Sequence, residues 1–137
     1  MAYDMVLFTK LAQRERNEYV ITCTDSSKTV IGKYVIQLIK SPRKRRAYAV
    51  GKLYSFREQT SVPRTLISSL DKHLSALAVE HNKDIVHTVE ISEDNAFGSY
   101  NKLPHLFTEN NYQPSSSSAN GCFVMKKLYT QQSASAF

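Results

Sequence analysis

Residues 65–91, TLISSLDKHLSALAVEHNKDIVHTVEI, carry a helix pattern followed at once by a strand pattern. In the first part, apolar residues recur at the i, i+3, i+4 spacing that gives a helix one apolar face. We therefore predict a helix over 65–82, with Thr65 as its N-cap. The apolar face comprises Leu66, Ile67, Leu70, Leu74, Leu77, Ala78 and His81.

The segment DIVHTVEI, residues 84–91, is dense in β-branched residues and apolar at successive positions. This pattern is typical of an interior strand that is covered on both faces. Downstream, residues 92–95 predict the start of a second helix over 96–110, which Pro104 must kink or split. A loop over 113–121 and a closing strand over 122–129 follow.

Upstream, three strand-like segments at 18–24, 29–40 and 46–57 are expected to pair antiparallel in sequence order. A proline-bearing basic loop joins the last two into a hairpin, and a further loop over 58–64 leads to the first helix. A short strand at 3–9 and a weak helical turn at 12–17 begin the chain. The fold class is therefore α+β, with antiparallel first strands, a helix–strand–helix unit and a closing C-terminal strand.

The 137 residues, 42% hydrophobic and 22% charged, suit one soluble domain, which we place at 1–130 with a flexible polar tail at 131–137. No apolar run is long enough to span a membrane, and the N-terminus lacks a signal-peptide pattern, so an intracellular protein is expected. Cys23 and Cys122 are far apart and lack metal-ligand spacing. We expect buried thiols and no metal site.

The net charge of +6 is concentrated in the first half of the chain, where 13 of the 18 Lys and Arg residues lie within 1–64. The segment KSPRKRR holds five of them: Lys40, Arg43, Lys44, Arg45 and Arg46. Cations gathered at a hairpin tip neutralise phosphates or carboxylates, and their binding weakens with salt. The basic hairpin predicts either contact with nucleic acid or an acidic protein, or simply a solvated loop.

The start of the first helix is a second candidate site, because unpaired N–H groups at a helix N-terminus suit a pyrophosphate. Arg57 and Arg64 flank it, but no glycine lies between Gly51 and Gly98 to let a cofactor approach the backbone closely. The histidines show no catalytic or metal spacing. His87 is nevertheless of interest, because polar side chains near the carboxyl end of an interior strand often face a ligand.

The order of elements from Glu18 to Tyr129 resembles the GNAT acetyltransferase fold, although the first strand and two opening helices of that family are compressed or absent here. In that family the fourth strand splays from the fifth, and the pantetheine arm of acyl-CoA enters the resulting V. The resemblance implies that 46–57 is the fourth strand, that 84–91 is the fifth, and that acetyl-CoA is a candidate cofactor.

The family's pyrophosphate loop, Q/R-x-x-G-x-G/A, aligns on Arg64 with Ile67 and Ser69 at the glycine positions. The resemblance thus implies Arg57, Arg64, Thr65 and Ser69 as cofactor-binding residues. The family's later pattern, N-x-x-A-x-x-L-Y-x-K-L-G-F, fits in two registers. One matches Ala96, Tyr100, Lys102 and Leu103, which makes Tyr100 the general acid; the other lies over 106–112 and places Phe107 at the tyrosine. Glu90 is a candidate base.

Three functions remain open on this reading. The first is a non-catalytic binding or accessory protein that uses the basic hairpin. The second is a divergent acetyl-CoA-dependent N-acetyltransferase. The third is a small assembly component of a larger complex, for example a viral one. The missing glycines favour the first and third functions, and the match around Tyr100 favours the second. A fold alone does not establish chemistry, so the fold does not decide among them.

Overall fold

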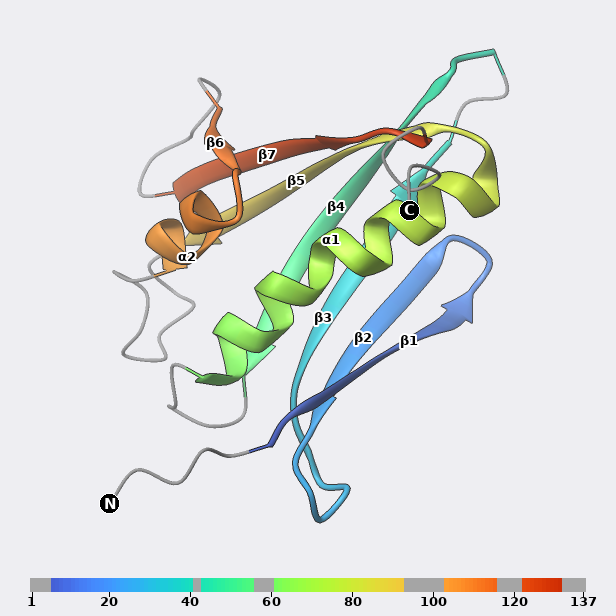
Figure 1. Ribbon diagram of the computed structural model, residues 1–137. Coiled ribbons are helices and arrows are strands. Elements are labelled where there is room, and N and C mark those ends of the chain that lie inside the picture. Colours follow the sequence, from blue (N-terminus) through green and yellow to red (C-terminus); the bar gives the residue numbers. More distant parts are fainter. Residues whose placement is uncertain (1–5, 41–42, 56–60, 93–102, 116–121, 132–137) are drawn as a thin grey trace.

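The computed structural model describes residues 6–40, 43–55, 61–92, 103–115 and 122–131 of the chain. The elements follow the order β1 (Phe8–Glu15), β2 (Glu18–Thr24), β3 (Val30–Ile39), β4 (Arg46–Ser55), α1 (Ser61–His81), β5 (Asp84–Ser92), α2 (Leu103–Glu109), β6 (Gln113–Pro114) and β7 (Cys122–Tyr129). The strands form one sheet in the order β1-β2-β3-β4-β5-β7-β6. Figure 1 shows α1 lying along one face of this sheet.

The sheet is mixed, because β4 and β5 pair in parallel while the other pairs of described strands are antiparallel. Strands β1 to β4 form an antiparallel meander, and β7 pairs antiparallel with β5. Helix α1 is the crossover that a parallel pair requires, since two parallel strands cannot be joined by a hairpin. The α+β class and the three antiparallel strands predicted upstream are therefore confirmed.

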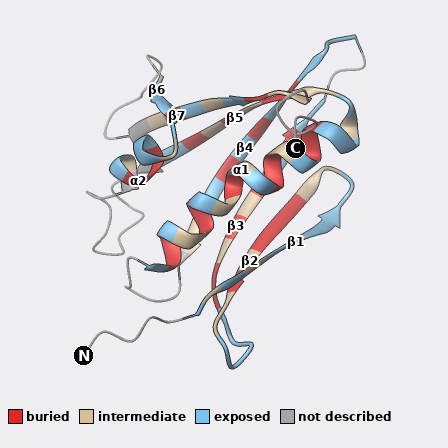
Figure 2. Ribbon diagram, in the orientation of Figure 1, coloured by how far each residue is buried: buried red, intermediate tan, exposed pale blue. Residues whose placement is uncertain are grey.

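The core lies between α1 and the sheet, as Figure 2 shows. On the helix, Leu66, Leu70 and Leu74 are fully buried. They meet alternate side chains of the central strands, because successive residues of a strand point to opposite faces. Each such leucine stabilises the fold by about 1.5–3 kcal/mol relative to exposure. Cys23 is a buried free thiol in β2.

Three predicted boundaries were wrong. Residues 12–15 belong to β1, which pairs with β2 across a tight turn at 16–17, and do not form a helical turn. Helix α1 begins at Ser61 and includes the buried Val62, both in residues assigned to the loop, so Thr65 lies inside the helix and is not its N-cap. Pro114 and Gln113 form β6 on the edge of β7.

Helix α2 begins at Leu103, so that Pro104 lies in its first turn, where a missing N–H breaks no helical hydrogen bond. The predicted helix start over 96–102, the predicted strand over 3–5 and most of the predicted tail lie outside the described residues. No helix in the described part of the chain has the length and apolar character needed to cross a membrane.

Strand β5 is interior to the sheet, as predicted, but among the described residues a helix covers it on one face and not on both. On the α1 face, Ile85, His87 and Val89 are buried. On the other face, Val86 is half-buried, and the neighbouring Val50 on β4 is 46% exposed. The helix therefore covers one face only.

Candidate functional site

Strands β4 and β5 pair over only part of their length. Their parallel register runs from Arg46↔Asp84 to Gly51↔Val89 and stops there. Beyond that point β4 continues to Ser55 against β3, while β5 continues to Ser92 against β7. Figure 1 shows β5 turning away from β4 toward α2. The sheet thus opens into a V whose apex is the Gly51–Val89 pair.

A glycine is required at this apex. A Cβ atom built on Gly51 would overlap the Tyr34 hydroxyl and Nε2 of His87, which fill the space beside its backbone on the α1 side. Tyr34 comes from β3 and His87 from β5, so both side chains converge on the strand between them. Gly51 therefore allows a hydrogen bond between its two neighbouring strands.

That hydrogen bond begins a chain of polar groups through the core. The Tyr34 hydroxyl lies 2.7 Å from His87 Nε2, and His87 Nδ1 lies 2.6 Å from the Tyr112 hydroxyl. The Tyr112 and Tyr129 hydroxyls are 2.6 Å apart, and Tyr129 donates to Asp71 Oδ1 at 2.8 Å. Lys127 Nζ, which is 2.7 Å from the same oxygen, completes an ion pair with Asp71. We call these groups from Tyr34 to Asp71 the polar chain.

The carboxylate at its end determines which group donates and which accepts in each hydrogen bond of the polar chain. Because the Tyr129 proton points to Asp71, the Tyr129 oxygen must accept from Tyr112. The Tyr112 oxygen then accepts from His87 Nδ1–H, which leaves Nε2 to accept from Tyr34. The geometry thus selects the Nδ1–H tautomer of a neutral His87.

Burial enforces these protonation states. Desolvation lowers the pKa of His87 to about 3, because its ring is enclosed by the core. Desolvation also raises the pKa of Tyr34, Tyr112 and Tyr129. All three phenols therefore keep their protons, and the polar chain carries its charge only at the Asp71–Lys127 end, where Asp71 is 48% exposed.

The predicted cofactor residues lie on or before α1. Arg64 is 57% exposed and 3.5 Å from a carboxylate oxygen of Glu109 on α2. Thr65 is half-buried, and the Ser69 hydroxyl donates to the Leu66 carbonyl within the helix. Because α1 begins at Ser61, the positions aligned with the family's loop glycines, at 67 and 69, fall inside the helix. Arg57 lies outside the described residues.

The two predicted catalytic residues are placed differently. Glu90 is exposed and is the first β5 residue past the apex of the V, on the face away from α1. Tyr100 lies outside the described residues. In the alternative alignment, Asn111 stands at the family's glycine, and its φ of 68° is the left-handed conformation that glycine favours. Phe107, buried in the core, then stands at the tyrosine.

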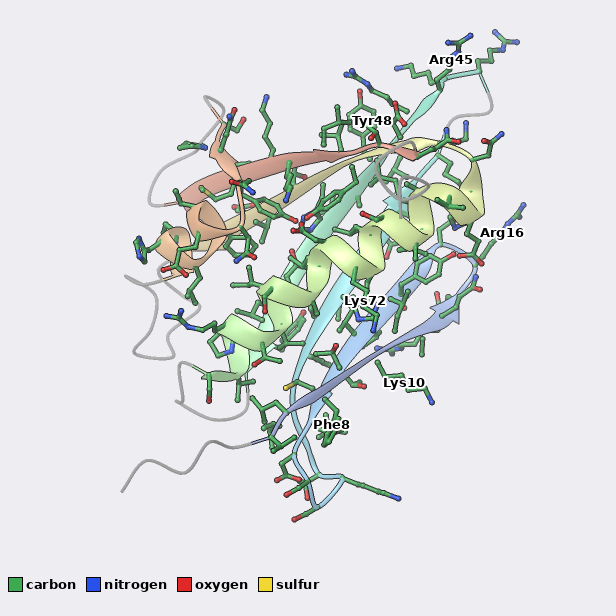
Figure 3. The ribbon with its side chains drawn as sticks, viewed as in Figure 1. Phe8, Lys10, Arg16, Arg45, Tyr48 and Lys72 are labelled. Atoms are coloured by element: carbon green, nitrogen blue, oxygen red, sulfur yellow. The ribbon has the colours of Figure 1, made fainter. Side chains whose placement is uncertain are left out.

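The basic hairpin projects from the opposite end of the sheet. Arg43, Lys44, Arg45 and Arg46 are all exposed, and Figure 3 shows Arg45 pointing away from the body of the protein. Lys83 Nζ donates to the Lys44 carbonyl at 2.6 Å, which attaches the tip to the end of α1. Lys40, also exposed, lies 3.1 Å from His81 Nδ1.

Sequence reasoning did not anticipate the polar chain. His87 was singled out for its position, but its partners Tyr34, Tyr112 and Tyr129 were not, because tyrosines in strands usually serve as core. A signal did exist, since Gly51 interrupts a long strand and such a glycine often marks a close approach.

No protein-family model and no curated protein sequence matches the chain significantly. Solved structures do. The GNAT domain of PAT from S. lividans matches with a TM-score of 0.60 and 16% identity, over 82% of this chain and 61% of that one. A spermidine N-acetyltransferase from Vibrio cholerae in complex with CoA and spermine matches with a TM-score of 0.57 and 16% identity, over 86% and 68%.

A domain from Methanocaldococcus jannaschii, 8% identical, matches with a TM-score of 0.52 over 83% of this chain and 68% of that one. This chain thus spans about three fifths of the first match and two thirds of the others. At such identities the matches establish the fold alone. Together with the V between β4 and β5, they show that this chain has a GNAT acetyltransferase-like fold.

Proposed function

We propose that the chain is a divergent acetyl-CoA-dependent N-acetyltransferase whose cofactor arm lies in the V. The main observation that supports this proposal is the separation of β4 from β5. Beyond Gly51 and Val89, the facing edges of the two strands no longer bond to each other. Backbone N–H and C=O groups of a strand need partners. The amides of a pantetheine arm would supply them in the manner of an added strand.

The residues on α1 suit the other end of the cofactor. The N-terminus of α1 offers N–H groups and a partial positive charge to a pyrophosphate. We assign this role to Arg57, Arg64, Thr65 and Ser69. Ser69 lies about two turns inside α1, and its hydroxyl would have to turn from the Leu66 carbonyl to the anion. The Glu109 carboxylate, 3.5 Å from Arg64, would have to release the guanidinium or share it with the anion.

When bound, acetyl-CoA supplies an activated thioester. An attacking amine must then lose a proton and the departing sulfur must gain one. Glu90 is the candidate acceptor, because it is exposed at the first β5 position past the apex. Tyr100 is the candidate donor.

A test uses spermidine as acceptor, because a structural match of this chain was solved with CoA and spermine. Acetyl transfer is measured as the release of free thiol from CoA. Glu90→Gln and Tyr100→Phe should each lower turnover while acetyl-CoA affinity, measured by calorimetry, stays unchanged. Glu80→Gln is the matched control, because Glu80 is exposed on α1. Unchanged turnover in either variant would remove that residue from the mechanism.

The basic hairpin supports a second candidate, a non-catalytic binding role toward nucleic acid or an acidic protein. Its supporting observation is that Arg43, Lys44, Arg45 and Arg46 are all exposed at the tip. Replacing Arg43, Lys44 and Arg45 together with alanine should weaken binding to single-stranded DNA and flatten its salt dependence. Replacing Arg14 and Lys28, which are exposed elsewhere, is the control. Equal salt slopes would exclude the hairpin.

A further inference from the structure

The sheet face opposite α1 carries a continuous row of apolar side chains. Register places Ile39 beside Tyr48, Tyr48 beside Val86, and Val86 beside Leu128, across β3, β4, β5 and β7. Residues that face each other on paired strands share one face of the sheet. Ile39 is 54%, Tyr48 43% and Leu128 44% exposed, and Val86 is half-buried. We call these four residues the apolar row.

The apolar surface continues two residues further along β4, where Val50 is 46% exposed. Parallel strands such as β4 and β5 normally have both faces covered. Here β1 joins β2 through a two-residue turn at 16–17, so no helix between them covers this face. A contiguous exposed apolar patch of this kind marks an interaction surface.

Charges around the row indicate the chemistry of the partner. Arg46, Lys52 and Lys126 are exposed on the same face. Arg46 and Lys126 also line a hollow of about 470 Å³ whose apolar walls include Val86 and Leu128. The exposed tip residues Arg43, Lys44 and Arg45 extend the positive region beyond Arg46.

The carboxylates beside the row are fewer. Asp84, whose Oδ1 accepts the backbone N–H of Gln131, and the exposed Glu90 lie beside the row on β5. Glu15 and Glu18 lie on this face farther away, on β1 and β2, beyond Gln37 and Val50. A second copy of the chain would bring like charges together across the contact. Nucleic acid would satisfy the cations but would place aliphatic Ile39, Val86 and Leu128 against phosphates or sugars. An acidic polypeptide with one apolar side satisfies both features.

We propose that this face is a docking surface for an acidic amphipathic helix of a partner protein. The apolar side of the helix covers the apolar row and Val50. Its carboxylates face Arg46 and Lys126 and extend toward the basic tip. A helix is the fitting occupant because it is the element that buries one apolar stripe against a sheet face. This inference does not depend on acetyl transfer.

The test uses two synthetic peptides of about 18 residues, long enough for five helical turns. Both carry leucines on one side; one carries glutamates and the other lysines on the remaining side. Fluorescence anisotropy of the labelled glutamate peptide should report binding that weakens with salt. Val50→Asp and Leu128→Asp should each weaken it at least about tenfold. Val79→Asp should not, because Val79 is equally exposed, at 52%, but lies on α1.

Charge reversal provides an independent arm. Lys126→Glu should weaken binding of the glutamate peptide and strengthen binding of the lysine peptide. Circular dichroism melts confirm that each variant is folded. The proposal is overturned if the glutamate peptide does not bind, if both peptides bind alike, or if Val50→Asp has no effect. A dimer in sedimentation that Leu128→Asp dissociates would also overturn it. So would single-stranded DNA that displaces the peptide and binds the Val50→Asp variant more weakly than the wild type.

Discussion

The buried His87 makes the stability of this protein depend on pH. Burial lowers its folded-state pKa to about 3, whereas the unfolded chain titrates at the ordinary value of 6.5. Between these values the unfolded chain binds a proton that the folded chain excludes. The free energy of unfolding is therefore fully retained above pH 6.5 and declines as the pH falls from 6.5 toward 3.

The size of this effect follows from the two pKa values. From about pH 7.5 to about pH 5, His87 alone should lower the free energy of unfolding by about 2 kcal/mol. The whole difference between the two pKa values is worth about 5 kcal/mol, which is reached only below the folded-state pKa of about 3. Protonation of His87 would also place a donor proton on Nε2, where the Tyr34 hydroxyl now donates.

Urea unfolding followed by circular dichroism at about pH 7.5 and about pH 5 measures the effect, with His87→Gln as the variant. Glutamine does not titrate, and its amide can accept from Tyr34 and donate to Tyr112. The variant should be less stable at the higher pH, yet should lose about 2 kcal/mol less on acidification. Burial also lowers the pKa of His73, so His73→Gln is the control and should keep most of the slope. Equal slopes in His87→Gln and wild type would refute the reasoning.

Three further substitutions test the packing around the V. Gly51→Ala should lower the free energy of unfolding by about 3 kcal/mol, because the new methyl group displaces Tyr34 and His87; chemical denaturation measures it, and a change within error would contradict the close approach. Tyr34→Phe should cost about 1–3 kcal/mol, since Nε2 of His87 loses its donor, and the shift of the imidazole ¹⁵N resonances should report that loss. Leu70→Ala should cost about 2–5 kcal/mol in the same denaturation assay, and a smaller cost would mean that α1 packs less tightly on the sheet than described.

Much of the fold was predictable from the sequence because its central elements are strongly periodic. The apolar face of α1 and the strand at β5 were predicted correctly, but the expected cover on both faces of β5 was not. The predicted first strand at 3–9 overlaps β1 at 8–9. The rest of β1 was missed because it is an exposed edge strand, with polar residues such as Gln13 and Arg14 on successive positions. The early start of α1 was missed because Pro63 and Arg64 resemble a loop.

The site was less predictable. The V is a loss of pairing between strands that are 38 residues apart at Gly51 and Val89, and no local pattern encodes it. The polar chain joins Tyr34 to His87 across 53 residues and His87 to Tyr112 across 25. The exposure of the basic hairpin, by contrast, could be predicted from the sequence, because four adjacent cations at 43–46 cannot be buried together.

Hydrogen exchange with and without saturating acetyl-CoA tests most directly whether the V holds the cofactor. Bound acetyl-CoA should slow exchange at the amides of 52–55 in β4 and 90–92 in β5, which face each other without pairing. The amides of 46–51 should change little, because β3 and β5 already flank that part of β4. No protection anywhere, or protection confined to other segments, would contradict the proposed acetyltransferase site.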